Sequence, residues 1–365
     1  MAANSRKQPL VYIGTYTSSL GFVDGMAEGI YIYRMDASTG DLKLQGVTTQ
    51  VENPSFLAIH PNGKFLYAVN ETEQATGAGA VSAFSINAAD GVLTFLNRQP
   101  ADGTAACHVA VEKNGHYLAI ANYGSGSVVL YPLQADGRIA TRSDFHQHAG
   151  KSDNVLRQEG PHAHSINIDP TNRFIFVADL GIDLVIGYRL DLEQGKLWPH
   201  SEFHAHPGAG PRHMAFHPNG RFTYIINELD STINACEYDS SLGHLSELQT
   251  VPSLPESFKG ASSCADIHIH PNGRFLYGSN RGDDSLVIYA IDETTGMLAY
   301  VGHASTQGKT PRNFAIDPTG TYLYAANQDS STIVAFRIDA HSGRLTPTGS
   351  VIRTPTPVCI KFFEV

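Results

Sequence analysis

The chain has 365 residues, of which 42% are hydrophobic and 16% are charged, with 34 glycines, 19 prolines and a formal net charge of −10. This composition favours many short strands joined by tight turns over a bundle of long helices. The negative charge and the lack of any run of Lys or Arg argue against a nucleic-acid partner, which normally requires a basic stripe.

The chain begins with a short polar segment, residues 1–9, which we expect to be flexible and which lacks the apolar core of a signal peptide. No stretch of about 18 apolar residues follows, so no membrane span is predicted. The four cysteines show no CxxC spacing and are too few for a disulfide framework. Together these features predict a cytoplasmic protein that does not act at a membrane.

A turn followed by a strand recurs along the chain at intervals of about 50 residues, a period typical of repeat folds. The Pro-Asn-Gly turn suits a tight hairpin, and the alternating aromatic and β-branched run after it suits a strand. The copies read HPNGKFLYAVN at 60–70, EKNGHYLAIAN at 112–122, DPTNRFIFVAD at 169–179, HPNGRFTYIIN at 217–227, HPNGRFLYGSN at 270–280 and DPTGTYLYAAN at 317–327.

A second marker, Gly-x-Leu or Gly-x-Ile, predicts the turn into an outer strand and occurs seven times. Its copies lie at 40–42, 91–93, 137–139, 195–197, 243–245, 296–298 and 343–345. The first marker has six copies because residues 10–17 look like a second strand without its first, and 356–363 look like a first strand without its second. Joining the two ends in one blade leaves no open sheet edge.

The sequence therefore predicts an all-β fold, a seven-bladed β-propeller with four antiparallel strands per blade. One domain would span residues 10–365, with the ring closed by the N- and C-terminal strands in one blade. A β-sandwich with similar hairpins is the disfavoured alternative. The repeated strand-end Asn and the His of the HPNG turn are interpreted as structural.

Positions at the mouth of the central channel do not repeat in this way. Before the inner strands lie His164, Arg212 and Arg312, and after the strand-end Asn lie Glu228 and Arg281. Three arginines near one mouth predict an anion site, since Arg binds carboxylate or phosphate through paired donors. The His and the Glu could act as general acid or base. The structural alternative is that Arg212 and Arg312 merely pair with Glu228 and Asp266.

Further candidates for substrate binding come from the same alignment of repeats or lie close to its positions. They are Arg312, His162, His108, Glu71, Gln328 and Lys309. Two HxH pairs, His162/His164 and His204/His206, could share a metal, but no carboxylate motif completes a ligand set. We predict neither a metal nor a cofactor. There is also no GxSxG nucleophile elbow and no P-loop.

Several segments resemble the lactonases with a seven-bladed propeller, which include bacterial 6-phosphogluconolactonases and fungal carboxymuconate cycloisomerases. The resemblance covers nearly the whole chain. It runs through VYIGTYT at 11–17, NPSFLAIHPNGKFLYAVNE at 53–71, GPHAHSINIDP at 160–170, GPRHMAFHPNGRF at 210–222, NELDSTI at 227–233, NRGDDSL at 280–286 and TPRNFAIDPTGTYLYAANQ at 310–328.

The resemblance implies an active site of a His, two Arg and a Glu, which match His164, Arg212, Arg281 and Glu228 in this sequence. It implies hydrolysis of a small anionic sugar lactone, foremost 6-phosphogluconolactone, with His164 or Glu228 as the general base. Two alternatives stay open: a cycloisomerase or lactonase acting on a carboxylated muconate-type lactone, and a non-catalytic propeller that binds a ligand on its face.

Overall fold

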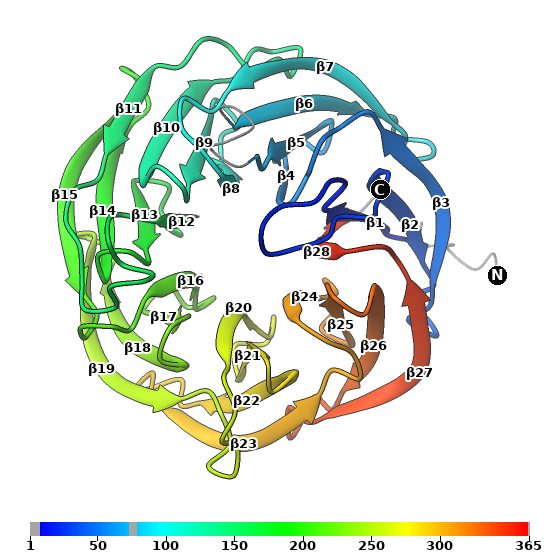
Figure 1. Ribbon diagram of the computed structural model, residues 1–365, viewed down its shortest axis with the longest axis vertical. Coiled ribbons are helices and arrows are strands. Elements are labelled where there is room, and N and C mark those ends of the chain that lie inside the picture. The colour runs from blue at the N-terminus through cyan, green and yellow to red at the C-terminus, as the bar shows by residue number, and fades with distance from the viewer. Residues whose placement is uncertain (1–7, 73–78, 364–365) are drawn as a thin grey trace.

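The computed structural model describes residues 8–72 and 79–363, which form seven four-stranded antiparallel sheets arranged in a ring (Figure 1). Blade 1 contains β28 (Pro357–Phe363), β1 (Leu10–Thr15), β2 (Gly29–Met35) and β3 (Leu42–Thr49). Blade 2 contains β4 (Leu57–Ile59), β5 (Phe65–Asn70), β6 (Ala80–Ile86) and β7 (Leu93–Pro100), and blade 3 contains β8 (Ala106–Val111), β9 (Tyr117–Asn122), β10 (Ser127–Pro132) and β11 (Asp144–Gln147).

The remaining four blades follow in chain order. Blade 4 contains β12 (Ala163–Ile168), β13 (Phe174–Asp179), β14 (Leu184–Asp191) and β15 (Lys196–His204), and blade 5 contains β16 (Pro211–Phe216), β17 (Phe222–Asn227), β18 (Thr232–Asp239) and β19 (His244–Pro252). Blade 6 contains β20 (Ser263–Ile269), β21 (Phe275–Arg281), β22 (Ser285–Ile291) and β23 (Leu298–Ser305), and blade 7 contains β24 (Pro311–Ile316), β25 (Tyr322–Asn327), β26 (Thr332–Ile338) and β27 (Leu345–Arg353).

The ring closes as predicted, through a blade shared by the two ends of the chain. Strand β28 pairs antiparallel with β1, with Leu10 opposite Phe363 and Ile13 opposite Ile360. In Figure 1 the first strand of each blade lies nearest the centre of the ring, with β28 beside β4 and β24. The predicted seven-bladed propeller is therefore confirmed.

Domain bounds of 10–365 and a flexible segment at 1–9 remain predictions. They extend onto residues 1–7, 73–78 and 364–365, which lie outside the described residues. Within the described part of the chain, no helix is long and apolar enough to span a bilayer.

The two repeated markers are joined in space by a hydrogen bond between neighbouring blades. In five blades a tyrosine in the second strand donates to the carbonyl oxygen of the next blade's turn glycine. The pairs are Tyr12–Gly91 (2.9 Å), Tyr67–Gly137 (3.1 Å), Tyr224–Gly296 (2.9 Å), Tyr277–Gly343 (2.8 Å) and Tyr324–Gly40 (2.7 Å). Because the last pair connects blade 7 to blade 1, these contacts also close the ring.

The turn glycine is required by both conformation and space. Gly40 has φ of +79°, and a Cβ there would lie 2.6 Å from the ring of Tyr322. Glycine alone adopts this backbone without strain. The marker therefore has a structural cause and carries no chemistry of its own.

The histidine of the HPNG turn is also part of the framework. His60 Nδ1 accepts from the backbone of Asn62, so its Nε2 carries the proton and donates to the carbonyl of Gly115 in the next blade at 3.0 Å. His217 and His270 make the same bond at 2.8 Å. These contacts support the structural interpretation made from the sequence.

Blade 3 departs from the predicted pattern. The marker at 137–139 predicts an outer strand, but Ile139 forms only an isolated bridge with Leu133, and β11 begins at Asp144. The backbone of Ile139 is bonded by side chains of blade 2, through Asn97 and Gln99 at 2.8–3.1 Å. Because its hydrogen bonds are already used, the ladder starts later, and β11 is followed by a long loop over residues 148–162 that reaches the channel mouth.

Candidate active site

A polar cavity of about 360 Å³ opens at the channel mouth. It is lined by Phe22, Glu71, Ala105, Cys107, Tyr123, Arg157, His164, Glu228, Ser263, Arg281 and Arg312. A second chamber of about 20 Å³ shares four of these residues, Glu71, Cys107, His164 and Arg312. It also contacts Phe56, His213 and Asn313, each of which follows the mouth residue of its blade by one position in the chain, so it is the deeper of the two.

Glu228 is held by three guanidinium groups. Its Oε2 accepts from Arg212 Nε at 2.8 Å and lies 2.8 Å from Arg281 Nη2, while Oε1 accepts from Arg157 Nη2 at 2.7 Å. Burial opposes ionisation of this carboxyl, but Arg281 and Arg212 outweigh it and hold the pKa of Glu228 well below its usual range. Glu228 is therefore a fixed anion that organises the arginines.

Arg212 is in turn oriented by a buried chain of polar groups. Its Nη1 donates to His213 Nε2 at 3.2 Å, and His213 Nδ1 donates to Asp266 at 2.7 Å. Burial, followed by the charge of Arg212, lowers the pKa of His213 to about 4, so the ring is neutral at pH 7. Only the Nδ1–H tautomer can donate to Asp266 and accept from Arg212 at the same time. Asp266 therefore fixes the tautomer that positions Arg212.

Burial and the neighbouring Arg281 also lower the pKa of Arg212, to about 10. The guanidinium remains charged at neutral pH. Four arginines and two glutamates line the two chambers together, so the mouth is electropositive within a protein of net charge −10. These charges support the anion site predicted from the sequence, which stays a prediction.

The opposite side of the mouth is built around Glu71. Its Oε2 accepts from Tyr16 Oη at 2.9 Å and from Ser55 Oγ at 2.5 Å. Arg312 lies over the rings of Tyr16 (5.8 Å) and Phe22 (5.0 Å). Among the described residues, no hydrogen bond or ion pair engages the Arg312 guanidinium, so its donors are available to a ligand.

His164 lines both chambers. Its Nδ1 is 3.9 Å from Cys107 Sγ, and its ring packs edge-on against Tyr123 and His213. Burial and the charge of Arg212 hold the pKa of His164 well below its usual range. The imidazole is therefore neutral at pH 7.

The structure brings together six of the predicted site residues and leaves four outside the two cavities. His164, Arg212, Glu228, Arg281, Arg312 and Glu71 converge on the mouth. The other four have different surroundings. His108 packs at a tilt against Phe56, with ring centroids 3.9 Å apart, and His162 stacks on Tyr123 at 4.5 Å. Gln328 is buried and donates to Asp329, and Lys309 is exposed on a loop.

Three of the four HxH histidines pair with separate carboxylates. His162 lies 3.3 Å from Glu159, His204 lies 3.4 Å from Glu202, and His206 pairs with Asp230. Over residues 8–72 and 79–363, no three His, Cys, Asp or Glu side chains gather as a metal site would require.

Sequence reasoning missed Arg157 and Phe22. Both lie on loops outside the repeated pattern, Arg157 between β11 and β12 and Phe22 between β1 and β2. An alignment of repeats compares positions that recur in every blade. It therefore gives no information about loop residues that occur in one blade only. The unusual spacing before GPHAH was the available signal that an insertion reaches the mouth.

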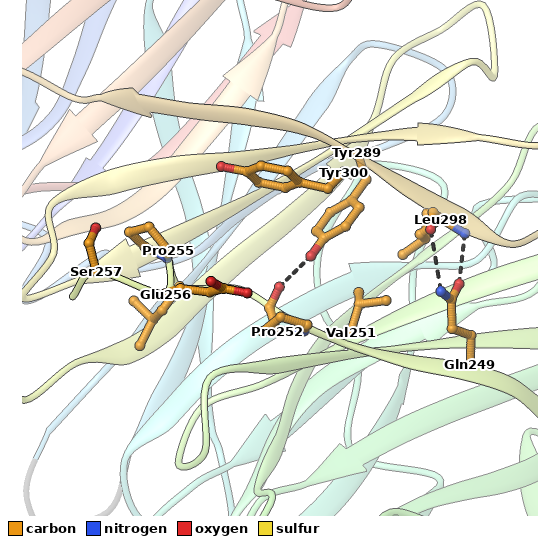
Figure 2. Close-up of a pocket in the computed structure, with 10 residues that line it drawn as sticks. Gln249, Val251, Pro252, Pro255, Glu256, Ser257, Tyr289, Leu298 and Tyr300 are labelled. Atoms are coloured by element: carbon orange, nitrogen blue, oxygen red, sulfur yellow. Dashed lines mark hydrogen bonds between the residues drawn. The ribbon is translucent and has the colours of Figure 1, made fainter. Parts of the chain in front are cut away.

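A larger cavity of about 850 Å³ lies away from the channel, where β19 of blade 5 meets β22 and β23 of blade 6 (Figure 2). Tyr289 Oη donates to Pro252 O at 2.5 Å, and Gln249 pairs with both backbone groups of Leu298. Its described lining includes one carboxylate, Glu256, and no cationic side chain. This cavity does not have the chemistry expected for an anionic substrate.

Comparison with known proteins agrees with the fold. Residues 10–362 match the protein family described as lactonase, 7-bladed beta-propeller. The 6-phosphogluconolactonase of Bacillus subtilis is 38% identical over 97% of this chain and 98% of its own length.

Solved structures agree as well. A Bacteroides fragilis crystal structure is 34% identical, with a TM-score of 0.90 and 99% of each chain covered. The periplasmic gluconolactonase of Pseudomonas aeruginosa is 31% identical, with a TM-score of 0.90 and coverage of 98% of this chain and 99% of its own. The chain belongs to the seven-bladed β-propeller lactonase family.

Proposed function

We propose that this protein hydrolyses 6-phosphogluconolactone to 6-phosphogluconate at the channel mouth. The observation that carries the proposal is an electropositive mouth, whose two chambers together are lined by four guanidinium groups, in a protein that is otherwise acidic. Such a site suits a substrate that brings a phosphate and develops a second negative charge during the reaction. The Bacillus subtilis relative is named for this activity. The cytoplasmic location expected from the sequence belongs to the same proposal.

The two chambers suggest how the substrate is oriented. Arg281 and Arg157 line the outer cavity only, whereas Arg212 lines the deep chamber and Arg312 lines both. The phosphate would bind to Arg281 and Arg157 in the outer cavity. The lactone carbonyl would then point inward, where Arg212 and Arg312 stabilise the oxyanion of the tetrahedral intermediate.

Glu228 serves this arrangement as an anchor. Both of its oxygens are engaged by guanidinium groups, and accepting a proton would remove the charge that holds three arginines in place. Neutral His164 would contact the ring oxygen of the lactone and deliver a proton to it as the ring opens.

The test is a rate measurement with purified protein on freshly prepared 6-phosphogluconolactone, against its spontaneous hydrolysis. Glucono-1,5-lactone and a carboxymuconate-type lactone serve as comparison substrates. We expect the highest kcat/KM for the phosphorylated lactone. A higher value for glucono-1,5-lactone would assign the neutral sugar lactone, and activity confined to the muconate-type lactone would reject both sugar substrates.

A further inference from the structure

The deep chamber at the channel mouth has the size of one water molecule. Its volume is about 20 Å³, and roughly 10–15 Å³ measured in this way is enough to hold a water. A buried water also needs two to four polar partners. The chamber offers the Glu71 carboxylate, the His164 imidazole and the Arg212 and Arg312 guanidinium groups.

We propose that this chamber holds the hydrolytic water and that Glu71 is the general base that takes its proton. The inference rests on the lactonase function proposed above and assigns a catalytic residue to it. Glu71 borders both chambers, so it contacts the water on one side and the substrate cavity on the other.

Hydrogen bonding leaves one oxygen of Glu71 available for this role. Both hydroxyl donors, from Tyr16 and Ser55, reach Oε2. No hydrogen bond from the described residues reaches Oε1. The two donors fix the orientation of the carboxylate, so Oε1 can be held toward the chamber without a change of rotamer.

The alternative bases are less suitable. Glu228 has no oxygen free of guanidinium contact. His164 is a neutral imidazole beside the same chamber, and it can relay a proton without acquiring a lasting charge next to Arg212. Glu228 therefore holds the arginines in place, Glu71 acts as the base, and His164 relays the proton.

The reaction balances with these groups alone. The water oxygen forms a bond to the lactone carbonyl carbon while one water proton passes to Glu71 Oε1, and the carbonyl π electrons move onto its oxygen beside Arg212 and Arg312. Collapse of this intermediate restores the C=O bond and breaks the bond to the ring oxygen. That oxygen takes the proton from Glu71 through His164 and becomes a hydroxyl, and the new carboxylic acid then ionises.

The experiment compares wild-type protein with Glu71→Gln, Glu71→Ala and a matched control, Glu247→Gln. Glu247 is an exposed carboxylate on β19 that also accepts a hydroxyl bond, from Thr250 at 2.7 Å. We expect Glu71→Gln to lower kcat on 6-phosphogluconolactone by at least about 100-fold with KM within about threefold. Added formate should restore part of the activity of Glu71→Ala, and Glu247→Gln should match the wild type.

Two results would overturn the assignment: a Glu71→Gln kcat within threefold of wild type, or an effect confined to KM. If Glu71→Gln does not fold, Tyr16→Phe and Ser55→Ala decide the question, because each leaves the carboxylate in place. They should lower kcat without raising KM, and unchanged kcat in both would refute the role. A wild-type protein inactive on every lactone would instead refute the proposed function.

Discussion

Two glutamates at the channel mouth occupy the same place in the repeat and have opposite surroundings. Glu71 follows the strand-end Asn70 in blade 2, and Glu228 follows Asn227 in blade 5. Glu228 is surrounded by three guanidinium groups, whereas Glu71 accepts two neutral hydroxyls through one oxygen. The difference shows that neighbouring blades and loops, rather than the repeat position itself, decide what a carboxylate can do.

The largest expected difference between the two glutamates is in stability. Glu228→Gln leaves three arginines without their carboxylate and should lower the free energy of unfolding by about 3–5 kcal/mol. Glu71→Gln keeps a hydrogen-bond acceptor for Tyr16 and Ser55 and should cost about 1 kcal/mol. Denaturant unfolding of the two variants measures this difference. An equal loss in free energy of unfolding would contradict the distinction between Glu228, which holds the arginines, and Glu71, which acts as the base.

The pH dependence of stability tests whether His213, on the Glu228 side of the mouth, is neutral in the native protein. His213 has a native pKa of about 4, below the unfolded value of 6.5, so the unfolded chain binds more protons and stability falls as the pH drops below 6.5. This one residue should cost about 2 kcal/mol between pH 7 and pH 5. His213→Gln should show a smaller loss over that interval in unfolding experiments. An identical pH dependence in both proteins would contradict the neutral tautomer.

Arg157 tests whether a loop outside the repeat contributes to substrate binding. Its side chain is 41% exposed, although it contacts Glu228 at 2.7 Å. Arg157→Ala should raise KM for 6-phosphogluconolactone about tenfold, a loss of about 1.4 kcal/mol in binding, with kcat within threefold. The same substitution should leave KM for glucono-1,5-lactone nearly unchanged. An equal rise for both lactones would remove Arg157 from phosphate binding.

Most of the fold was predictable from sequence because its causes are local. The Pro-Asn-Gly turn and the positive-φ glycine of each Gly-x-Leu marker require particular residue types, so the pattern repeats wherever a blade does. The outer strand of blade 3 was placed too early because Asn97 and Gln99 bond the backbone of Ile139, and such contacts between blades leave no local pattern.

The candidate site was predictable only where it follows the repeat. Arg212, Glu228 and Arg281 emerge from aligned positions, and the structure brings both arginines within hydrogen-bonding distance of Glu228. Arg157 has no aligned position. The same alignment also proposed Gln328, which the fold buries beside Asp329, and the adjacent loop residue Lys309, which the fold exposes. A backbone position near the channel mouth does not determine whether a long side chain points into the cavity.

The most direct test of the channel mouth as the active site is the kcat/KM of Arg312→Ala on 6-phosphogluconolactone. Arg312 has no ion pair among the described residues, so its loss should barely affect folding. Arg337 is a matched control, since it also lies over a tyrosine, Tyr322, at 5.8 Å in the same blade but outside the mouth. We predict a loss of at least about 30-fold for Arg312→Ala, equal to about 2 kcal/mol of transition-state stabilisation, and wild-type activity for Arg337→Ala. Equal activity in the two variants would contradict the account.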